Sequence, residues 1–196
     1  SSLIISLLFL AACQSDQNNS SADREVYAIA KLTVAKDALV NKPGEGLAYY
    51  SGKPFTGTSL TYYANGKKSA SMDYVRGKKD GLYRKWFEDG LLSFESHYTA
   101  GKREGVTRSW WRNGNLRSES RFLQGHAHGI QKQWYTSGAK FKVMNLNKGK
   151  EEGMQKSWRE NGKVYNNYEA KNGRIFGLKR ANLCFQLEDE NIQYED

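Results

Sequence analysis

The stretch GLYRKWFEDGLLSFESHYTAGKRE (Gly81–Glu104) decides the fold of this chain. Its first part, Leu82–Glu88, is rich in aromatic and apolar residues and has the length of a β-strand, as does Leu91–Thr99 after it. Between them stands Asp89-Gly90, and such pairs are typical of type I′ turns, whose two central residues both need positive φ. We therefore predict a β-hairpin with its tight turn at Asp89-Gly90 and a wider turn in the GKREG segment that follows.

The same pattern recurs every 24 residues along most of the chain. Three glycine series and one tryptophan series keep a common register, and the first glycine series is Gly57, Gly81, Gly105, Gly129, Gly153 and Gly177. The repeat predicts an all-β fold: an elongated, single-layer antiparallel β-meander of tandem hairpin repeats. At ~4.8 Å per strand, five two-stranded units would extend over roughly 50 Å.

The segment TYYANGKKSASMDYVRGKKDG (Thr61–Gly81) and its three further copies resemble the bacterial variant of the MORN repeat, as found in YwqK-type antitoxin-like proteins. Units of that family read roughly Y-x-NGK … Y-x-x-GK-x-DG, and GKPFTG (Gly52–Gly57) resembles the turn that leads into such arrays. The resemblance covers about residues 47–177 and implies a MORN-like β-hairpin array. It implies no particular function, and an antitoxin role does not suit an exported lipoprotein.

The N-terminus predicts export and lipid attachment. Leu3–Ala12 is an apolar run too short to span a bilayer but suited to the core of a signal peptide. Leu10-Ala11-Ala12-Cys13 resembles the bacterial lipobox, which implies a signal peptide over residues 1–12 and lipid attachment at Cys13. Because Gln14 and not Asp follows this cysteine, we expect the anchor to lie in the outer membrane of a bacterial cell envelope.

Four further segments follow from composition and from the repeat. A polar, flexible tether is expected over residues 13–23 and a capping segment, either a short helix or a strand pair, over residues 24–46. The repeat array is expected over residues 47–177. Residues 178–196 are expected to hold a closing strand, NLCFQL (Asn182–Leu187), and an acidic tail that guards the sheet edge.

Equivalent residues of the repeats form columns along the predicted sheet, and positions 82, 84 and 86 share one face. Three of these columns predict a hydrophobic spine. They are the apolar column (Leu82, Val106, Ile130, Met154, Leu178), the tryptophan column (Trp86, Trp110, Trp134, Trp158) and an aromatic column (Tyr74, Tyr98, Phe122, Leu146). Between the first two stands a wholly basic column: Arg84, Arg108, Lys132, Lys156 and Arg180. Its side chains either lie along the tryptophan rings or line a groove for an extended anionic ligand.

Composition narrows the classes of partner. Residues 1–180 carry 30 basic and 16 acidic groups, a balance of +14, whereas residues 181–196 hold five carboxylates and no Lys or Arg. A basic body favours anionic partners such as phospholipid headgroups or acidic glycans, or it keeps a repeat protein soluble. Nucleic acid fits the charge, but the export signal argues against it.

The repeated residues do not resemble an active site, because enzymes show one asymmetric polar cluster. The carboxylates Asp80, Glu104 and Glu152 recur with the array and indicate turn chemistry. His126 and His128 are weak candidates for a metal site without a third ligand nearby, and Cys184 is expected to be a small buried residue. We expect neither enzymatic activity nor a cofactor.

Three functions remain open. The first is a non-catalytic, envelope-anchored interaction scaffold that presents its sheet to a protein partner, and the sequence favours it. The second is a binder of an anionic membrane surface or acidic glycan through the basic column. The third is a metal-handling or enzyme-accessory lipoprotein that uses His126, His128 and Cys184.

Overall fold

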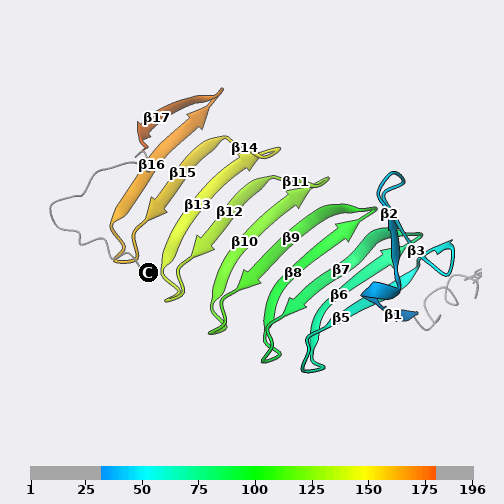
Figure 1. Ribbon diagram of the computed structural model, residues 1–196. Coiled ribbons are helices and arrows are strands. Elements are labelled where there is room, and N and C mark those ends of the chain that lie inside the picture. The colour runs from blue at the N-terminus through cyan, green and yellow to red at the C-terminus, as the bar shows by residue number, and fades with distance from the viewer. Residues whose placement is uncertain (1–31, 180–196) are drawn as a thin grey trace, which may run out of the picture. The chain divides into compact units, whose positions relative to one another are not determined.

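The computed structural model describes residues 32–179. The predicted signal peptide and tether, Cys13, Arg180, Cys184 and the segment Asn182–Leu187 lie outside the described residues. Within them the chain forms a 14-stranded sheet and a three-stranded sheet (Figure 1). The prediction of an all-β meander of tandem hairpin repeats is confirmed, since nearly every strand of the large sheet pairs antiparallel with its neighbours in chain order.

The elements fall into three groups. The N-terminal elements are β1 (Thr33–Ala35), a 3-10 turn η1 (Lys36–Ala38), β2 (Val40–Lys42), β3 (Leu47–Tyr50) and β4 (Lys53–Pro54). The main strands are β5 (Gly57–Tyr62), β6 (Lys68–Val75), β7 (Lys78–Trp86), β8 (Leu92–Thr99), β9 (Lys102–Trp110), β10 (Leu116–Leu123), β12 (Gly129–Trp134), β13 (Lys140–Asn147), β15 (Gly153–Trp158), β16 (Val164–Lys171) and β17 (Arg174–Leu178). Two short strands, β11 (His126–Ala127) and β14 (Lys150–Glu151), pair with β10 and β13.

The strand register defines two faces of the large sheet. Residues directly opposite each other on neighbouring strands share a face, so Tyr83 lies with Ser96 and Arg84 with Glu95 on the other side. We call the side of the columns that begin at Leu82, Arg84 and Trp86 the tryptophan face. The opposite side, which holds Tyr83, Ser96 and the equivalent residues of the other repeats, is the capped face.

The two kinds of turn are the reverse of the sequence prediction. The type I′ turns join the repeats, as at Arg76-Gly77, where φ is +48° and +80°. Asp89-Gly90 instead lies in a wider turn, in which Gly90 donates its N–H to Phe87 and takes positive φ. The Asp89 side chain accepts the N–H of Leu91 at 3.0 Å, which explains the preference for Asp or Asn there without a left-handed backbone.

Each tight turn is held by the repeat before it. The Gly101 N–H donates to the Lys79 carbonyl at 2.7 Å, and the Asp80 carboxylate accepts the Ala100 N–H at 2.9 Å. Glu104 does the same for Gln124 at 2.8 Å, one period later. These bonds explain how Ala100 and Gln124 sit at positive φ, and they place Asp80 and Glu104 in turn chemistry.

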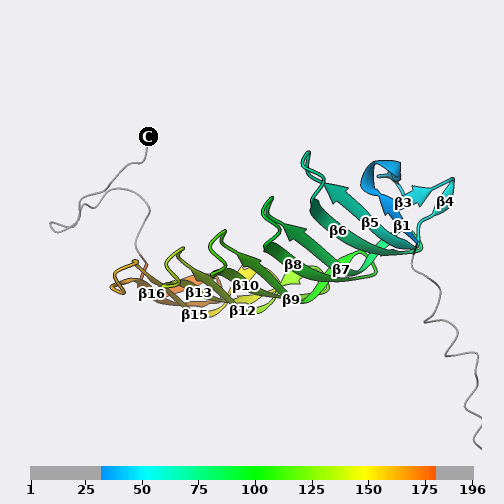
Figure 2. The same ribbon diagram turned by 90° about the horizontal axis from the view of Figure 1, so that it is seen from below.

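The core lies at the N-terminal end, where the three-stranded sheet covers the capped face (Figure 2). Leu39, Ala48 and Phe55 pack there against Met72 and Tyr74 of β6. β1 adds to the same end as a parallel partner of β5. Residues 33–42 thus form short strands and one 3-10 turn, and this second layer is what buries the core.

The predicted spine is wrong for the C-terminal part of the apolar column, whereas Leu82 and Val106 are half-buried. Ile130 and Met154 are 52% and 56% exposed, and Leu178 is 47% exposed. Their column lies on the tryptophan face, which no second layer of the described residues covers. The buried residues of the array lie on the capped face and include polar ones such as Thr107, Gln131 and Gln155. Tyr74 of the aromatic column is buried there as predicted.

Candidate interaction surface

The tryptophans stand near one end of their strands, half-buried, and their backbone is tied to the preceding repeat. The Tyr63 hydroxyl donates to the Trp86 carbonyl at 2.6 Å, and the Trp111 ring N–H donates to the Trp134 carbonyl at 3.1 Å. Tyr135 repeats this bond with Trp158 at 3.0 Å. The sequence interpretation missed this column of aromatic donors, although the 24-residue register contains it. These bonds fix the tryptophan column relative to its neighbours.

The basic column on this face is largely paired with carboxylates. Arg84 Nε lies 2.7 Å from Glu95 Oε2, and Arg108 Nε lies 2.9 Å from Glu119 Oε2. Lys132 Nζ is 4.0 Å from the other oxygen of Glu119. Glu95 and Glu119 stand directly across from the two arginines in the sheet, so the pairing follows from the register.

The contacts of the basic column differ from one member to the next. Lys156 alone of the described members has its charge near a column tryptophan, with Nζ 5.4 Å from the Trp158 ring centroid. Arg84 and Arg108 are paired with Glu95 and Glu119, which does not suit a continuous basic groove for an anionic ligand. The tryptophan face therefore combines half-exposed apolar side chains, indole rings and ion-paired guanidinium groups.

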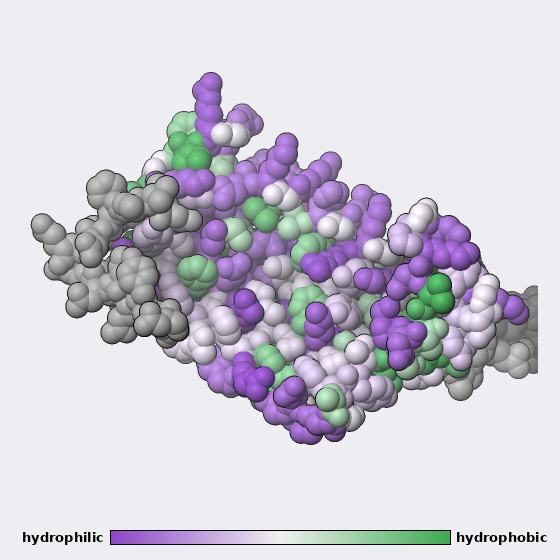
Figure 3. Space-filling view, in the orientation of Figure 1, coloured by the Kyte–Doolittle hydropathy of each residue, from purple (hydrophilic) through white to green (hydrophobic). Residues whose placement is uncertain are grey.

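Unpaired positive charge gathers elsewhere, along the edge of the sheet that carries the tight turns. One Lys, Arg or His side chain per repeat follows each turn and is exposed, and none forms an ion pair with another described residue. We call this set the turn-cation row: Lys78, Lys102, His126, Lys150 and Arg174. Figure 3 shows hydrophilic side chains standing out along this upper edge. The repeat register contains the row, but the sequence interpretation weighed only the strand interiors.

Two of the histidines, His126 and His128, lie on this edge. His126 is an exposed member of the turn-cation row, whereas His128 occupies the position of Asp80 and Glu104 in the repeat. The His128 Nδ1 atom is buried without a hydrogen-bond partner among the described residues. In residues 32–179, no group of three or more His, Cys, Asp or Glu residues is placed to hold a metal ion.

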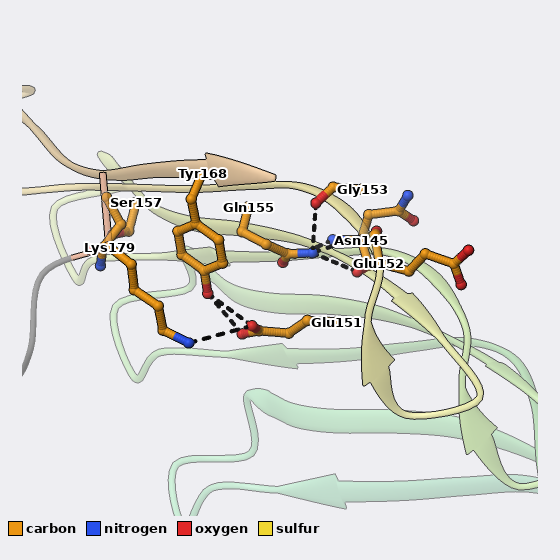
Figure 4. A network of polar contacts seen from close by, with 9 residues as sticks. Asn145, Glu151, Glu152, Gly153, Gln155, Ser157, Tyr168 and Lys179 are labelled. Carbon is orange, nitrogen blue, oxygen red and sulfur yellow. Dashed lines mark hydrogen bonds and ion pairs between the residues drawn. The ribbon is translucent and has the colours of Figure 1, made fainter. Parts of the chain in front are cut away.

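A polar network organises the C-terminal end of the array (Figure 4). The Gln155 amide, 1% exposed, donates to the Asn145 carbonyl at 2.8 Å and accepts the Asn145 N–H at 3.3 Å. The Tyr168 hydroxyl donates to Glu151 at 2.9 Å, and Lys179 lies 3.6 Å from that carboxylate. Burial, followed by the hydrogen bond to Glu151, raises the pKa of Tyr168 to about 12.

The fold and this surface define a tandem β-hairpin repeat protein with one open, aromatic face. Comparison with known families agrees: residues 103–124 match the family model of the MORN repeat variant. Repeats of this kind mediate interactions with proteins or membranes. No curated protein matches the chain. Within the described residues, no helix has the length and apolar character needed to cross a membrane.

Proposed function

We propose that this protein is a non-catalytic interaction scaffold that presents its tryptophan face to a protein partner. One observation carries the proposal: Ile130 and Met154, each more than half exposed, lie in the same uncovered face as the tryptophans. Exposed apolar groups that gather on one surface mark interaction sites, and Trp, Met and Arg are enriched in protein interfaces. The arginines of this face are already neutralised by Glu95 and Glu119, which favours a protein over a polyanion.

The proposal includes the cellular location. The run Leu3–Ala12 followed by Cys13 supports a lipoprotein of the bacterial envelope, anchored through that cysteine, and Gln14 supports the outer membrane. The YwqK-type pattern supports the same bacterial setting. An anchored scaffold meets its partner within the envelope, so the envelope fraction is the place to search.

A capture experiment tests the scaffold. Full-length wild-type protein in detergent is compared with an Ile130→Asp, Met154→Asp double variant for retention of solubilised envelope proteins at low and high salt. We expect one protein to be retained by the wild type at high salt and its affinity to fall at least ~30-fold in the variant, because central apolar contacts contribute ~2 kcal/mol or more. The matched control is Leu91→Asp, Val40→Asp, since both residues are about as exposed and neither belongs to a strand of the large sheet: Leu91 lies in a wide turn and Val40 in β2. Equal retention by the two double variants would reject the tryptophan face as the binding surface.

The turn-cation row supports a second candidate, binding to an anionic membrane surface or an acidic glycan. Its four Lys and Arg side chains are exposed and form no ion pair with described residues, unlike the arginines of the basic column. Contacts between exposed charges weaken as salt screens them. The same capture experiment distinguishes the two candidates. If the wild type retains lipid or glycan only at low salt, and a variant with Lys78, Lys102 and Lys150 changed to Glu retains none, the second candidate replaces the first.

A further inference from the structure

An asymmetric polar site lies where the N-terminal elements cover the first repeat. A hollow of about 340 Å³ opens there between η1 and β2 on one side and β5, β6 and β7 on the other. Volumes of 300–1,000 Å³ are typical of small-molecule sites. The other repeats have no such cover among the described residues, so the hollow occurs at one end of the array.

The lining combines two cations with hydroxyl groups and aromatic rings. Lys36 of η1 and Lys79 of β7 contribute the charge, and no carboxylate is among the lining residues. Neither lysine forms an ion pair with another described residue, and Lys79 lies over the Tyr98 ring, with Nζ 5.5 Å from its centroid. The charge of the site is therefore uncompensated, which favours an anionic ligand.

The rest of the lining supplies polar and flat apolar contacts. Asn41, Ser59 and Thr61 carry hydrogen-bonding side chains, and Tyr74 and Tyr83 contribute rings. Tyr74 is 3% exposed and packs on Phe55, with ring centroids 5.7 Å apart, so this wall is rigid. Burial raises the pKa of Tyr74, which keeps its hydroxyl neutral. A second hollow of about 260 Å³ shares Asn41, Tyr74 and Lys79 with the first and lengthens the site.

We propose that this hollow binds a small acidic sugar, such as a uronic acid. A carboxylate would pair with Lys36 or Lys79, the sugar hydroxyls would bond to Asn41 and Thr61, and the flat side of the sugar ring would lie on Tyr83, because Ser59 and Tyr74 are buried. A bare anion would leave the hydroxyl and tyrosine lining unused. The site lies on the capped face and involves none of the residues assigned to the protein partner, so it stands or falls independently of the proposed function.

Isothermal titration of the full chain in detergent tests the proposal, with glucuronate as the probe and glucose and inorganic phosphate as comparisons. We expect glucuronate to bind at least ~10-fold more tightly than either, because each comparison lacks one half of the recognised chemistry. Lys79→Gln and Lys36→Gln should each weaken glucuronate binding ~10-fold or more, as loss of a charged hydrogen bond does.

Lys53→Gln is the matched control, because Lys53 is an exposed lysine of β4 in the small sheet and lines neither hollow. It should leave the glucuronate affinity within about twofold of the wild type. Three results would each overturn the acidic-sugar site: absence of glucuronate binding, phosphate binding as tight as that of glucuronate, or equal glucuronate affinity in the Lys79→Gln and Lys53→Gln proteins.

Discussion

Phe55→Ala should lower the free energy of unfolding by about 3–5 kcal/mol, the usual cost of truncating a buried phenylalanine. Phe55 is 2% exposed and lies between Tyr50 and Tyr74, with ring centroids 6.0 Å and 5.7 Å from its own. It joins the small sheet to the first repeat, and the array has few other apolar residues in a closed core. Because domains retain only about 5–15 kcal/mol in total, this loss is severe.

Urea unfolding followed by circular dichroism measures this effect, and hydrogen exchange locates it. Protection of the β5 and β6 amides should fall most, because those strands lie under the small sheet. Phe141→Ala is the control: Phe141 is 38% exposed and contacts Tyr135 at a centroid distance of 5.0 Å. We expect a loss of about 1 kcal/mol or less there. A Phe55 variant no less stable than the Phe141 variant would mean that the small sheet does not anchor the array.

Gln155→Leu should lower the free energy of unfolding by about 2–3 kcal/mol, although leucine is apolar and similar in size. The wild-type amide satisfies both the carbonyl and the N–H of Asn145 and donates a longer bond to the Gly153 carbonyl at 3.3 Å. The substitution removes the hydrogen-bond partner of these backbone groups. Buried polar groups without a partner lower the free energy of unfolding. Gln131 makes similar bonds one period earlier, to the carbonyls of Arg121, His128 and Gly129.

Gln133→Leu is the control for this effect. Gln133 belongs to the same strand as Gln131 and is only half-buried, and no side-chain hydrogen bond to a described residue is seen for it. Its replacement should change the free energy of unfolding by no more than about 0.5 kcal/mol. Equal losses in the two variants, measured by urea unfolding, would show that the Gln155 hydrogen bonds do not stabilise the array.

The 24-residue period was enough to predict the meander and the columns, because equivalent residues must occupy equivalent places in a repeat. It could not show which face is covered. Ile130 and Met154 have the appearance of core residues, yet they are exposed, since the covering layer comes from residues 33–54 and lies on the other side. Gln131 and Gln155 have the appearance of surface residues, yet their amides serve buried backbone groups.

The prediction of the turn types failed for a related reason. Asp89-Gly90 is a local signal for a type I′ turn, but the carboxylate of Asp89 is used by Leu91 N–H in a wider turn. Ala100-Gly101 is a weak local signal, yet it forms the tight turn because Asp80 and Lys79 of the previous repeat hold its backbone. The hollow at the N-terminal end was likewise beyond prediction, as it joins η1 and β2 to β7.

Site-specific photo-crosslinking in intact bacterial envelopes tests the central claim, that the tryptophan face binds a protein, most directly. A benzophenone-bearing amino acid is placed at position 130 or 154 on that face, and at position 122 or 144 on the capped face as the comparison. Our account predicts that both tryptophan-face positions form an adduct with the same protein, and that the capped-face positions form none with it. Adducts to that protein from the capped face, and none from positions 130 and 154, would contradict it.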